Sequence, residues 1–241
     1  MIVLPVMPAE QTASWLALLD LYERLDHGWT LIGGQLVHLH CAERGRHPDR
    51  ATNDADAVID VRADPTMLHT FTKTLTDLGF RSAGVSAEGL QHRWLRDEAC
   101  VDVLLPEGIG ERARARTGVT GSPTLPTQGG TQALARSEVA AVTVDGREGH
   151  VLRPNLVGAL VGKAAAHGNT GDRDLRRHRR DFLILAGLIN AADFRNETVT
   201  AKDRQRLGRM VIAIDKDLEL TLEVAGAGDA LTRLRMAANL A

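Results

Sequence analysis

The chain has 241 residues, of which 44% are hydrophobic and 25% charged, with 29 basic side chains against 31 acidic ones. These values are ordinary for a folded globular protein and exclude disordered, collagen-like and fibrous classes. The balanced charge excludes a general basic coat for nucleic acid, and four Phe, three Trp and one Tyr are too few for a platform that stacks single-stranded bases. We therefore expect any contact with a polyanion to be local.

The first part of the chain alternates helical and strand patterns. The predicted helices span 9–25, 35–43 and 65–78, and the predicted strands span 29–32, 54–61, 92–96 and 99–105. A tight turn at Asp97-Glu98 joins the last two strands. Asp145-Gly146 predicts a hairpin between strands 139–144 and 150–152, with 147–149 lengthening the loop. We expect 107–136, rich in Gly, Thr and Pro, to be a long irregular connection.

The rest of the chain is predicted to be helical. Apolar periodicity predicts helices over 155–167, 174–190, 200–216 and 227–239. The change of pattern near Pro154 divides the chain into an α/β region, 1–153, and a helical region, 154–241. The expected fold class is therefore α+β, with a mixed sheet, flanking helices and a helical C-terminal region.

The cysteines and the chain's start bear on its compartment. Cys41 and Cys100 lie outside any CxxC or disulfide pattern, so we expect two free thiols in apolar surroundings. The first residues carry no basic segment and no small-residue cleavage site. No apolar run approaches the roughly 20 residues of a membrane span. We expect a cytoplasmic protein with no membrane partner.

Three acidic residues indicate a metal site. Asp54 and Asp56 lie two positions apart in one predicted strand, so both side chains leave the same face. Such carboxylates repel each other unless a cation lies between them, and Mg²⁺ binds one or two carboxylates together with substrate phosphates. Asp102 is the polar position of an otherwise apolar strand, and strand pairing would bring it beside the other two. The pattern predicts a pair of divalent ions that clamp the attacking and leaving oxygens.

Gly33-Gly34 ends a predicted strand and opens a helix. Glycines there let backbone N–H groups approach phosphate oxygens at the positive end of the helix. Neither Gly-Gly nor Asp-x-Asp is specific by itself, because half-exposed strands often carry surface acids. The order strand, Gly-Gly, helix, Asp-x-Asp strand and later strand with a lone Asp is much more specific, and it favours phosphate and metal chemistry.

These segments resemble a known family. The matching residues are Leu31-Ile-Gly-Gly34, Arg50-Ala-Thr-Asn-Asp54-Ala-Asp56 and Val101-Asp-Val103. They resemble the DNA polymerase β-type nucleotidyltransferase superfamily and, more narrowly, the AbiEii/MenT-like nucleotidyltransferase toxins, where Arg-x-Thr precedes Asp-x-Asp. Lys163 and Arg180-Asp181 are similar to that group's helical Lys and Arg/Lys-Asp motifs. The resemblance covers roughly residues 29–188.

The resemblance implies a nucleotidyltransferase fold and a Mg²⁺- or Mn²⁺-dependent transfer of a nucleoside monophosphate from an NTP to a hydroxyl group, in a cleft that the helical region completes. The residues it implies as catalytic are Asp54, Asp56, Asp102, Lys163 and Asp181, the first three as metal ligands. Asp102 would also help to activate the attacking hydroxyl. Lys163 would contact the nucleotide phosphates, and Asp181 would orient Lys163 or the base and sugar. The nucleotide-binding residues would be Gly33, Gly34, Thr52, Lys163, Arg176 and Arg180.

Arginines concentrate beside these motifs. The segment 173–180 contains Arg173, Arg176, Arg177, Arg179 and Arg180. Arg176 and Arg180 share a face at i,i+4 spacing, and guanidinium groups suit phosphate, so we expect these two to face the nucleotide. The loop arginines Arg44, Arg46 and Arg50 would extend the same patch. The alternatives are a solvated helix face for the arginines and a partly buried ion pair between two helices for Lys163 and Asp181.

The acceptor and partners follow from the resemblance. It implies the 3′ end of tRNA as the acceptor and a cognate antitoxin protein that restrains the enzyme. Two alternatives stay open. The same fold would modify a small molecule or a protein, which the balanced charge and scarce aromatics favour. A degenerate domain would only bind a partner, although the presence of all three acids counts against it.

Overall fold

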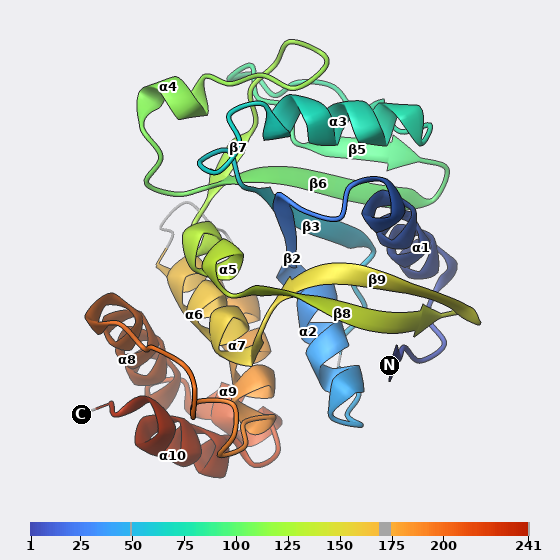
Figure 1. Ribbon diagram of the computed structural model, residues 1–241. Coiled ribbons are helices and arrows are strands. Elements are labelled where there is room, and N and C mark those ends of the chain that lie inside the picture. Colours follow the sequence, from blue (N-terminus) through green and yellow to red (C-terminus); the bar gives the residue numbers. More distant parts are fainter. Residues whose placement is uncertain (49, 169–174, 241) are drawn as a thin grey trace.

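A mixed sheet, a smaller curled sheet and a group of C-terminal helices form the computed structural model, which describes residues 1–48, 50–168 and 175–240 (Figure 1). The strands are β1 (Ile2–Val3), β2 (Trp29–Ile32), β3 (Asp54–Ile59), β4 (Arg81–Ser82), β5 (Arg93–Arg96), β6 (Ala99–Pro106), β7 (Leu125–Thr127), β8 (Ser137–Val144) and β9 (Arg147–Pro154). The helices are α1 (Ala9–Arg24), α2 (Gly33–Glu43), α3 (Met67–Asp77), α4 (Glu111–Arg114), α5 (Gly130–Ala135), α6 (Leu156–His167), α7 (Leu175–Gly187), α8 (Ala201–Asp215), α9 (Leu218–Glu223) and α10 (Ala227–Ala238). The expected α+β class is confirmed.

The larger sheet has the strand order β2-β3-β6-β5-β4, and β7 also pairs with β6. Its central strands β3 and β6 are parallel, whereas β2 and β5 are antiparallel to their neighbours. The alternation predicted for β3 is confirmed, because Ala55 and Ala57 are fully buried while Asp54 and Asp56 are partly exposed. The sheet thus has one apolar face in the core and one face that carries acids.

The smaller sheet, β1-β8-β9, contains the predicted hairpin with a shorter loop than expected. Asp145 and Gly146 have φ values of 48° and 79°, and Val144 pairs directly with Arg147. Two consecutive residues in the left-handed region form a two-residue turn that matches the twist of the strands. The prediction that 147–149 lengthen the loop was therefore wrong, since these residues belong to β9.

The connection 107–136 is more ordered than predicted. It contains α4, β7 and α5, and β7 pairs in parallel with the last part of β6. A three-residue strand with Pro126 at its centre has no alternation to read, so the pattern could not reveal it. α5 begins after Gly129, whose φ is +82°, and a Cβ there would lie 2.8 Å from the Cα of Gly162. α5 therefore packs closely on α6.

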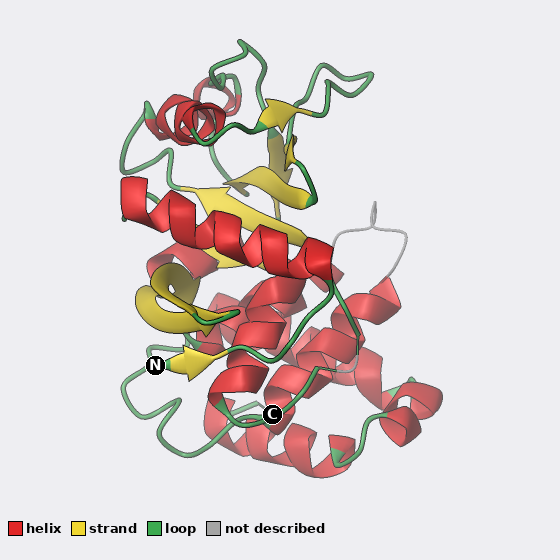
Figure 2. Cartoon of the chain, turned by 90° about the vertical axis from the view of Figure 1, so that its right-hand side faces the viewer, coloured by secondary structure: helices red, strands yellow, loops and turns green. Residues whose placement is uncertain are grey.

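The C-terminal part is helical, as expected, and gathers below the larger sheet (Figure 2). No helix was predicted between 216 and 227, but α9 lies there, and the side chain of Asp217 caps its start by accepting a hydrogen bond from the Leu220 N–H. The predicted start at 174 lies outside the described residues. Within the described ranges, every helix is too short or too polar to cross a membrane.

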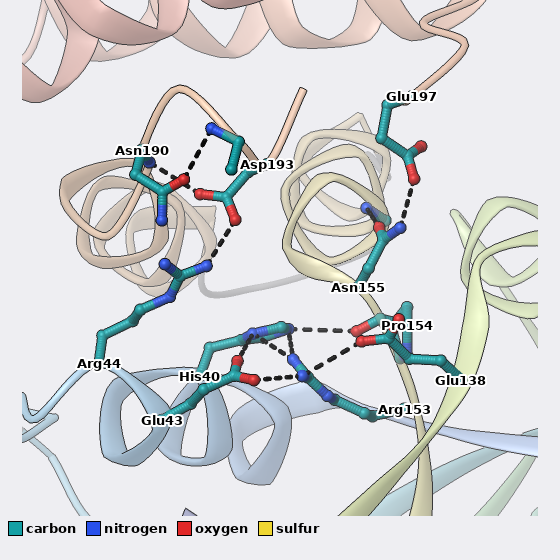
Figure 3. A network of polar contacts seen from close by, with 12 residues as sticks. His40, Glu43, Arg44, Glu138, Arg153, Pro154, Asn155, Asn190, Asp193 and Glu197 are labelled. Carbon is teal, nitrogen blue, oxygen red and sulfur yellow. Dashed lines mark hydrogen bonds and ion pairs between the residues drawn. The ribbon is translucent and has the colours of Figure 1, made fainter. Parts of the chain in front are cut away.

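A polar network ties α2 to β9 (Figure 3). Arg153 donates from Nη1 to the Nδ1 atom of buried His40 at 2.7 Å and from Nη2 to Glu43 at 2.6 Å. The His40 Nε2 atom lies 3.2 Å from the carbonyl oxygen of Pro154. The network is accompanied by two further pairs, Arg44 with Asp193 and Asn155 with Glu197. The Arg44 contact joins the α/β region to the segment that follows α7, and the Asn155 contact joins the start of α6 to the same segment.

Candidate active site

The three predicted acidic residues lie together on the polar face of the larger sheet. The parallel register of β3 and β6 places Asp56 opposite Asp102, and Asp54 lies two residues earlier on the same face. One carboxylate oxygen from each of the three lies within 4.8 Å of the others. The expected convergence of the three carboxylates is therefore present in the structure.

The electrostatics of this cluster favour a cation. Burial and, after it, the neighbouring charges of Asp54 and Asp102 raise the pKa of Asp56 to about 7, against the smaller opposing effects of Lys163 and Arg177. A carboxylate in this position is costly to ionise until positive charge approaches it. Carboxylate oxygens are also the donors that Mg²⁺ and Mn²⁺ prefer. The residues present thus fit a divalent metal ion.

Gly33 and Gly34 let helix α2 begin directly against the acids. The helix starts at the glycines, two residues earlier than predicted. Gly34 lies so close to Thr52 that a Cβ would be 2.6 Å from the Thr52 Oγ1 atom. Thr52 in turn donates a hydrogen bond to Asp54 at 3.1 Å. Among the described residues, no side chain caps the start of α2. Uncapped N–H groups at a helix start are suited to phosphate oxygens.

Arg93 is a site residue that the sequence interpretation missed. It donates from Nε to Asp102 Oδ1 at 2.9 Å and from Nη2 to Asp102 Oδ2 at 2.7 Å, and Nη2 also lies 3.3 Å from Asp54 Oδ2. The hydrogen bond with Asp102 is the main reason why the pKa of Arg93 is raised. A signal for this contact was present, because a two-residue turn at Asp97-Glu98 fixes the register and sets Arg93 opposite Asp102.

Lys163 and Asp181 form a buried ion pair on facing helices. The Lys163 Nζ atom donates to Asp181 Oδ2 at 2.7 Å, and both side chains are almost fully buried. Arg50 donates to the two oxygens of the same carboxylate at 3.1 and 2.9 Å. Burial opposes ionisation of Asp181, but the charges of Lys163 and Arg50 and their hydrogen bonds hold its pKa below the ordinary value. Asp181 therefore fixes two cations beside the acid cluster.

The acid cluster, Gly33 and Gly34, Lys163, Arg50 and Arg93 border one cleft with a volume of about 370 Å³. This size is typical of small-molecule sites. The predicted residues that line it are Gly33, Gly34, Thr52, Asp54, Asp56, Asp102 and Lys163. It is also lined by the predicted loop residue Arg50 and by the polar residues Arg93, Thr127, Gln128, Arg177 and His178. Asp181 lies behind Lys163 and is not part of the lining. The cleft thus combines an acidic cluster with a basic wall.

The expected arginines of α7 are placed differently. Arg176 and Arg180 donate to the two oxygens of Glu223 in α9 at 2.8 and 2.7 Å, and neither lines the cleft. Arg177 lines it instead, because it lies four residues before Asp181 on the same helical face. Helical spacing from Asp181 would have identified it.

Of the remaining predicted arginines, Arg50 lines the cleft, and Arg44 and Arg46 lie apart from it. Arg44 pairs with Asp193, and Arg46 borders a separate cavity beside α7 and α10. Arg50 is the one of these three loop residues that lines the cleft. Arg173 lies outside the described residues.

The comparisons with known proteins concern the fold. No family model and no curated protein sequence matches the chain. An antigenic nucleotidyltransferase-like protein from Paracoccidioides brasiliensis is 14% identical, with 93% of each chain covered and a TM-score of 0.50. The antibiotic-resistance factor ANT(2'')-Ia is 13% identical, with 88% of this chain and 97% of that chain covered and a TM-score of 0.46. The first likeness shows that this chain has a nucleotidyltransferase-like fold, as the sequence predicted.

Proposed function

We propose that this chain is a nucleotidyltransferase, which transfers a nucleoside monophosphate from an NTP to a hydroxyl group and releases pyrophosphate. The observation that carries the proposal is the convergence of Asp54, Asp56 and Asp102 in one cleft with the start of α2 and Lys163. The nucleotidyltransferase-like fold supports it. Acids to hold cations and N–H groups to hold phosphates are the two requirements of phosphoryl transfer.

The metal sites would consist of Asp54, Asp56 and Asp102. Mg²⁺ or Mn²⁺ bound there would neutralise charge on the phosphates during transfer. Asp102 would accept the proton of the acceptor hydroxyl, whose oxygen forms a bond to the α-phosphorus. The bond from the α-phosphorus to the bridging oxygen of the β-phosphate breaks, and pyrophosphate leaves. This assignment gives each of the three carboxylates a role in the reaction.

The basic wall of the cleft would bind the triphosphate. Gly33 and Gly34 leave the first N–H groups of α2 open to it, and Lys163 lines the cleft with its ammonium group held by Asp181. Arg50 is held by the same carboxylate and lines the same wall. A cation fixed in place loses little conformational entropy when it binds phosphate, so this arrangement supports prepositioned binding.

A toxin-type role is the finer proposal. The resemblance to AbiEii/MenT-like enzymes favours the 3′ end of tRNA as the acceptor, with a cognate antitoxin protein as the partner that restrains the enzyme. Co-expression with the product of an adjacent reading frame tests this partner. An antitoxin restores growth that the chain alone arrests, whereas unaffected growth contradicts a toxin role.

One observation favours a second candidate, a small-molecule or protein hydroxyl as the acceptor. Arg176 and Arg180, which were expected to face phosphates, pair with Glu223. Their charges are thus balanced within the chain. Salt separates the two acceptors, because tRNA binding weakens steeply as salt rises and binding of a small acceptor does not. If the acceptor is tRNA, Arg176→Gln should weaken its binding; if the acceptor is a small molecule, Arg176→Gln should leave its binding unchanged.

The reaction is tested with purified chain, each NTP labelled at the α-phosphate, Mg²⁺ or Mn²⁺, and either total tRNA or a pool of small hydroxyl compounds. The expected result is transfer of label to one acceptor with an equal amount of pyrophosphate released. A chain that binds nucleotide and Mg²⁺ but transfers no label would contradict the proposal. Absence of both binding and transfer would favour the degenerate, partner-binding alternative.

A further inference from the structure

We propose that Arg93 competes with divalent cations for the carboxylates of Asp54 and Asp102, so that a cation binds fully only when the guanidinium group leaves Asp54. Arg93 is then a positioning residue that sets the metal affinity of the site. The inference rests on the proposed function, because it assigns the acid cluster to metal binding.

The contacts of Arg93 are with two of the three carboxylates that would hold a metal ion. Its Nη2 atom lies 2.7 Å from Asp102 Oδ2 and 3.3 Å from Asp54 Oδ2, so a single nitrogen atom of the guanidinium group bridges two of the three carboxylates. A guanidinium group is permanently charged and forms short, charge-assisted bonds with carboxylates. A cation between the same oxygens would meet this positive charge at close range, which makes simultaneous binding unfavourable.

The two contacts differ in strength, and this difference indicates which of them opens. The bond to Asp102 is bidentate, with Nε at 2.9 Å and Nη2 at 2.7 Å, whereas Asp54 receives one longer contact. The Arg93 side chain is 44% exposed and that of Asp54 is 38% exposed. A long, partly exposed side chain can change its rotamer, and the single, longer contact with Asp54 is the first that such a change would break. The exchange requires no movement of β5.

A purely structural role makes a different prediction. An arginine that only neutralises and orients the acids would hold Asp102 in its metal-binding position, and its removal would leave cation affinity unchanged or weaken it. Competition predicts the opposite sign, because the acids would gain net negative charge when the guanidinium is removed. The sign of the change in metal affinity therefore decides between the two roles.

The test measures Mn²⁺ affinity of the full-length chain at pH 8 without nucleotide, by isothermal titration calorimetry and by electron paramagnetic resonance of free Mn²⁺. Arg93→Gln is expected to bind Mn²⁺ about tenfold tighter than the wild type or more, because it removes a unit charge next to the ion. Arg93→Lys keeps the charge but loses the bidentate fork, and its affinity should lie between the two. The matched control is Arg96→Gln, which removes an arginine of the same strand that pairs with Asp20.

Each outcome has one meaning. Tighter binding by Arg93→Gln with an unchanged control supports competition, and affinity within twofold of the wild type, or weaker, overturns it. If Arg93→Gln does not fold, as judged by thermal unfolding, Arg93→Lys replaces it: tighter Mn²⁺ binding than the wild type supports competition, and equal or weaker binding overturns it. A wild type that binds Mn²⁺ and transfers label while Arg93 variants bind equally removes only this inference. Folded wild type and variants that all fail to bind Mn²⁺ would remove the metal-dependent function as well.

Discussion

A Cβ atom on Gly33 would lie 1.8 Å from the Oδ2 atom of Asp56, which no side chain could tolerate without displacing that carboxylate. The two residues are neighbours because Ile32 of β2 pairs with Asp56 of β3, so helix α2 starts at the edge of the acid cluster. Gly33 also has a φ of +74°, in the left-handed region that favours glycine. Glycine at this position thus allows the start of helix α2 and a carboxylate of the acid cluster to lie in direct contact.

Gly33→Ala should therefore impair both stability and reaction. The strained φ and the collision with Asp56 are expected to lower the free energy of unfolding by about 1–3 kcal/mol, and displacement of the carboxylate should reduce nucleotide transfer about 10²-fold. Urea unfolding and label transfer measure the two effects. Gly208→Ala is the matched control, because Gly208 lies inside α8 with open space around its Cβ position. That variant should gain about 0.5–1 kcal/mol, and equal behaviour of both variants would contradict the account.

Asp56→Asn should stabilise the metal-free chain and abolish its response to metal. Burial and the charges of Asp54 and Asp102 raise the pKa of Asp56 from 3.8 to about 7, so ionisation destabilises the folded state increasingly as pH rises between these values. At pH 8 the variant should gain about 1–3 kcal/mol of unfolding free energy and lose the increase in melting temperature that Mn²⁺ gives the wild type. Asp77→Asn serves as a control, because the side chain of Asp77 is exposed on the surface of α3. A destabilised Asp56→Asn would contradict the proposed repulsion.

Asp181→Asn should destabilise the chain because Lys163 and Arg50 would then share a site without their counter-charge. Removing one partner of a buried ion pair typically costs about 3–5 kcal/mol, and both Lys163 and Asp181 are almost fully buried. The double variant Lys163→Met/Asp181→Asn should lose less than the sum of the single losses, with a coupling of about 1–3 kcal/mol. Urea unfolding of the four chains measures this coupling. Additive losses would show that the pair is not an energetic unit.

The Glu43 contacts predict how stability falls in acid. Burial opposes ionisation of Glu43, but its contact with His40 and the charge and hydrogen bond of Arg153 outweigh this and lower its pKa from 4.5 to about 2. The stabilisation is therefore complete above pH 4.5 and is lost as pH falls from 4.5 toward 2. Glu43→Gln should reduce stability at pH 6 by about 1–3 kcal/mol and flatten the loss between pH 5 and 3.

The control for this pH profile is Glu138→Gln. Glu138 contacts the same Arg153 at 3.2 Å, but its side chain is 49% exposed, so we expect its removal to leave the acid limb of the profile unchanged. Urea unfolding at pH 6, 5, 4 and 3 compares the three chains. A Glu43→Gln profile that keeps the slope of the wild type would contradict the assignment.

The acid cluster could be predicted because its information is local. Alternation in Asp54-Ala-Asp56 fixes the face of each side chain whatever the neighbours are, and an apolar strand around Asp102 marks a central position in the sheet. Asp54 and Asp56 lie close together because they belong to the same strand, so no strand pairing is needed to bring these two together. The Gly33-Gly34 turn could be predicted for a similar reason, because glycine adopts the left-handed φ found at Gly33 whatever its neighbours are.

Other parts of the site depend on packing that the sequence does not display. The orientation of α7 decides that Arg177 lines the cleft while Arg176 pairs with Glu223. That pairing depends on α9, which lies in a stretch where periodicity predicted no helix. β7 is too short to show a pattern. Arg93 could be predicted in part. The correctly predicted turn at Asp97-Glu98 places it opposite Asp102, but its second contact, with Asp54, depends on the pairing of β3 with β6, which the turn does not determine.

The most direct test of the central claim compares Asp54→Asn with wild type in the transfer of α-labelled nucleotide in the presence of Mn²⁺. Asp54 is held by Thr52 and Arg93 within the acid cluster, and the amide keeps its shape while it removes its charge. The account predicts label transfer and pyrophosphate release by wild type and by the control Asp77→Asn, and a loss of about 10²-fold or more in Asp54→Asn. Transfer by Asp54→Asn at the wild-type rate would contradict it.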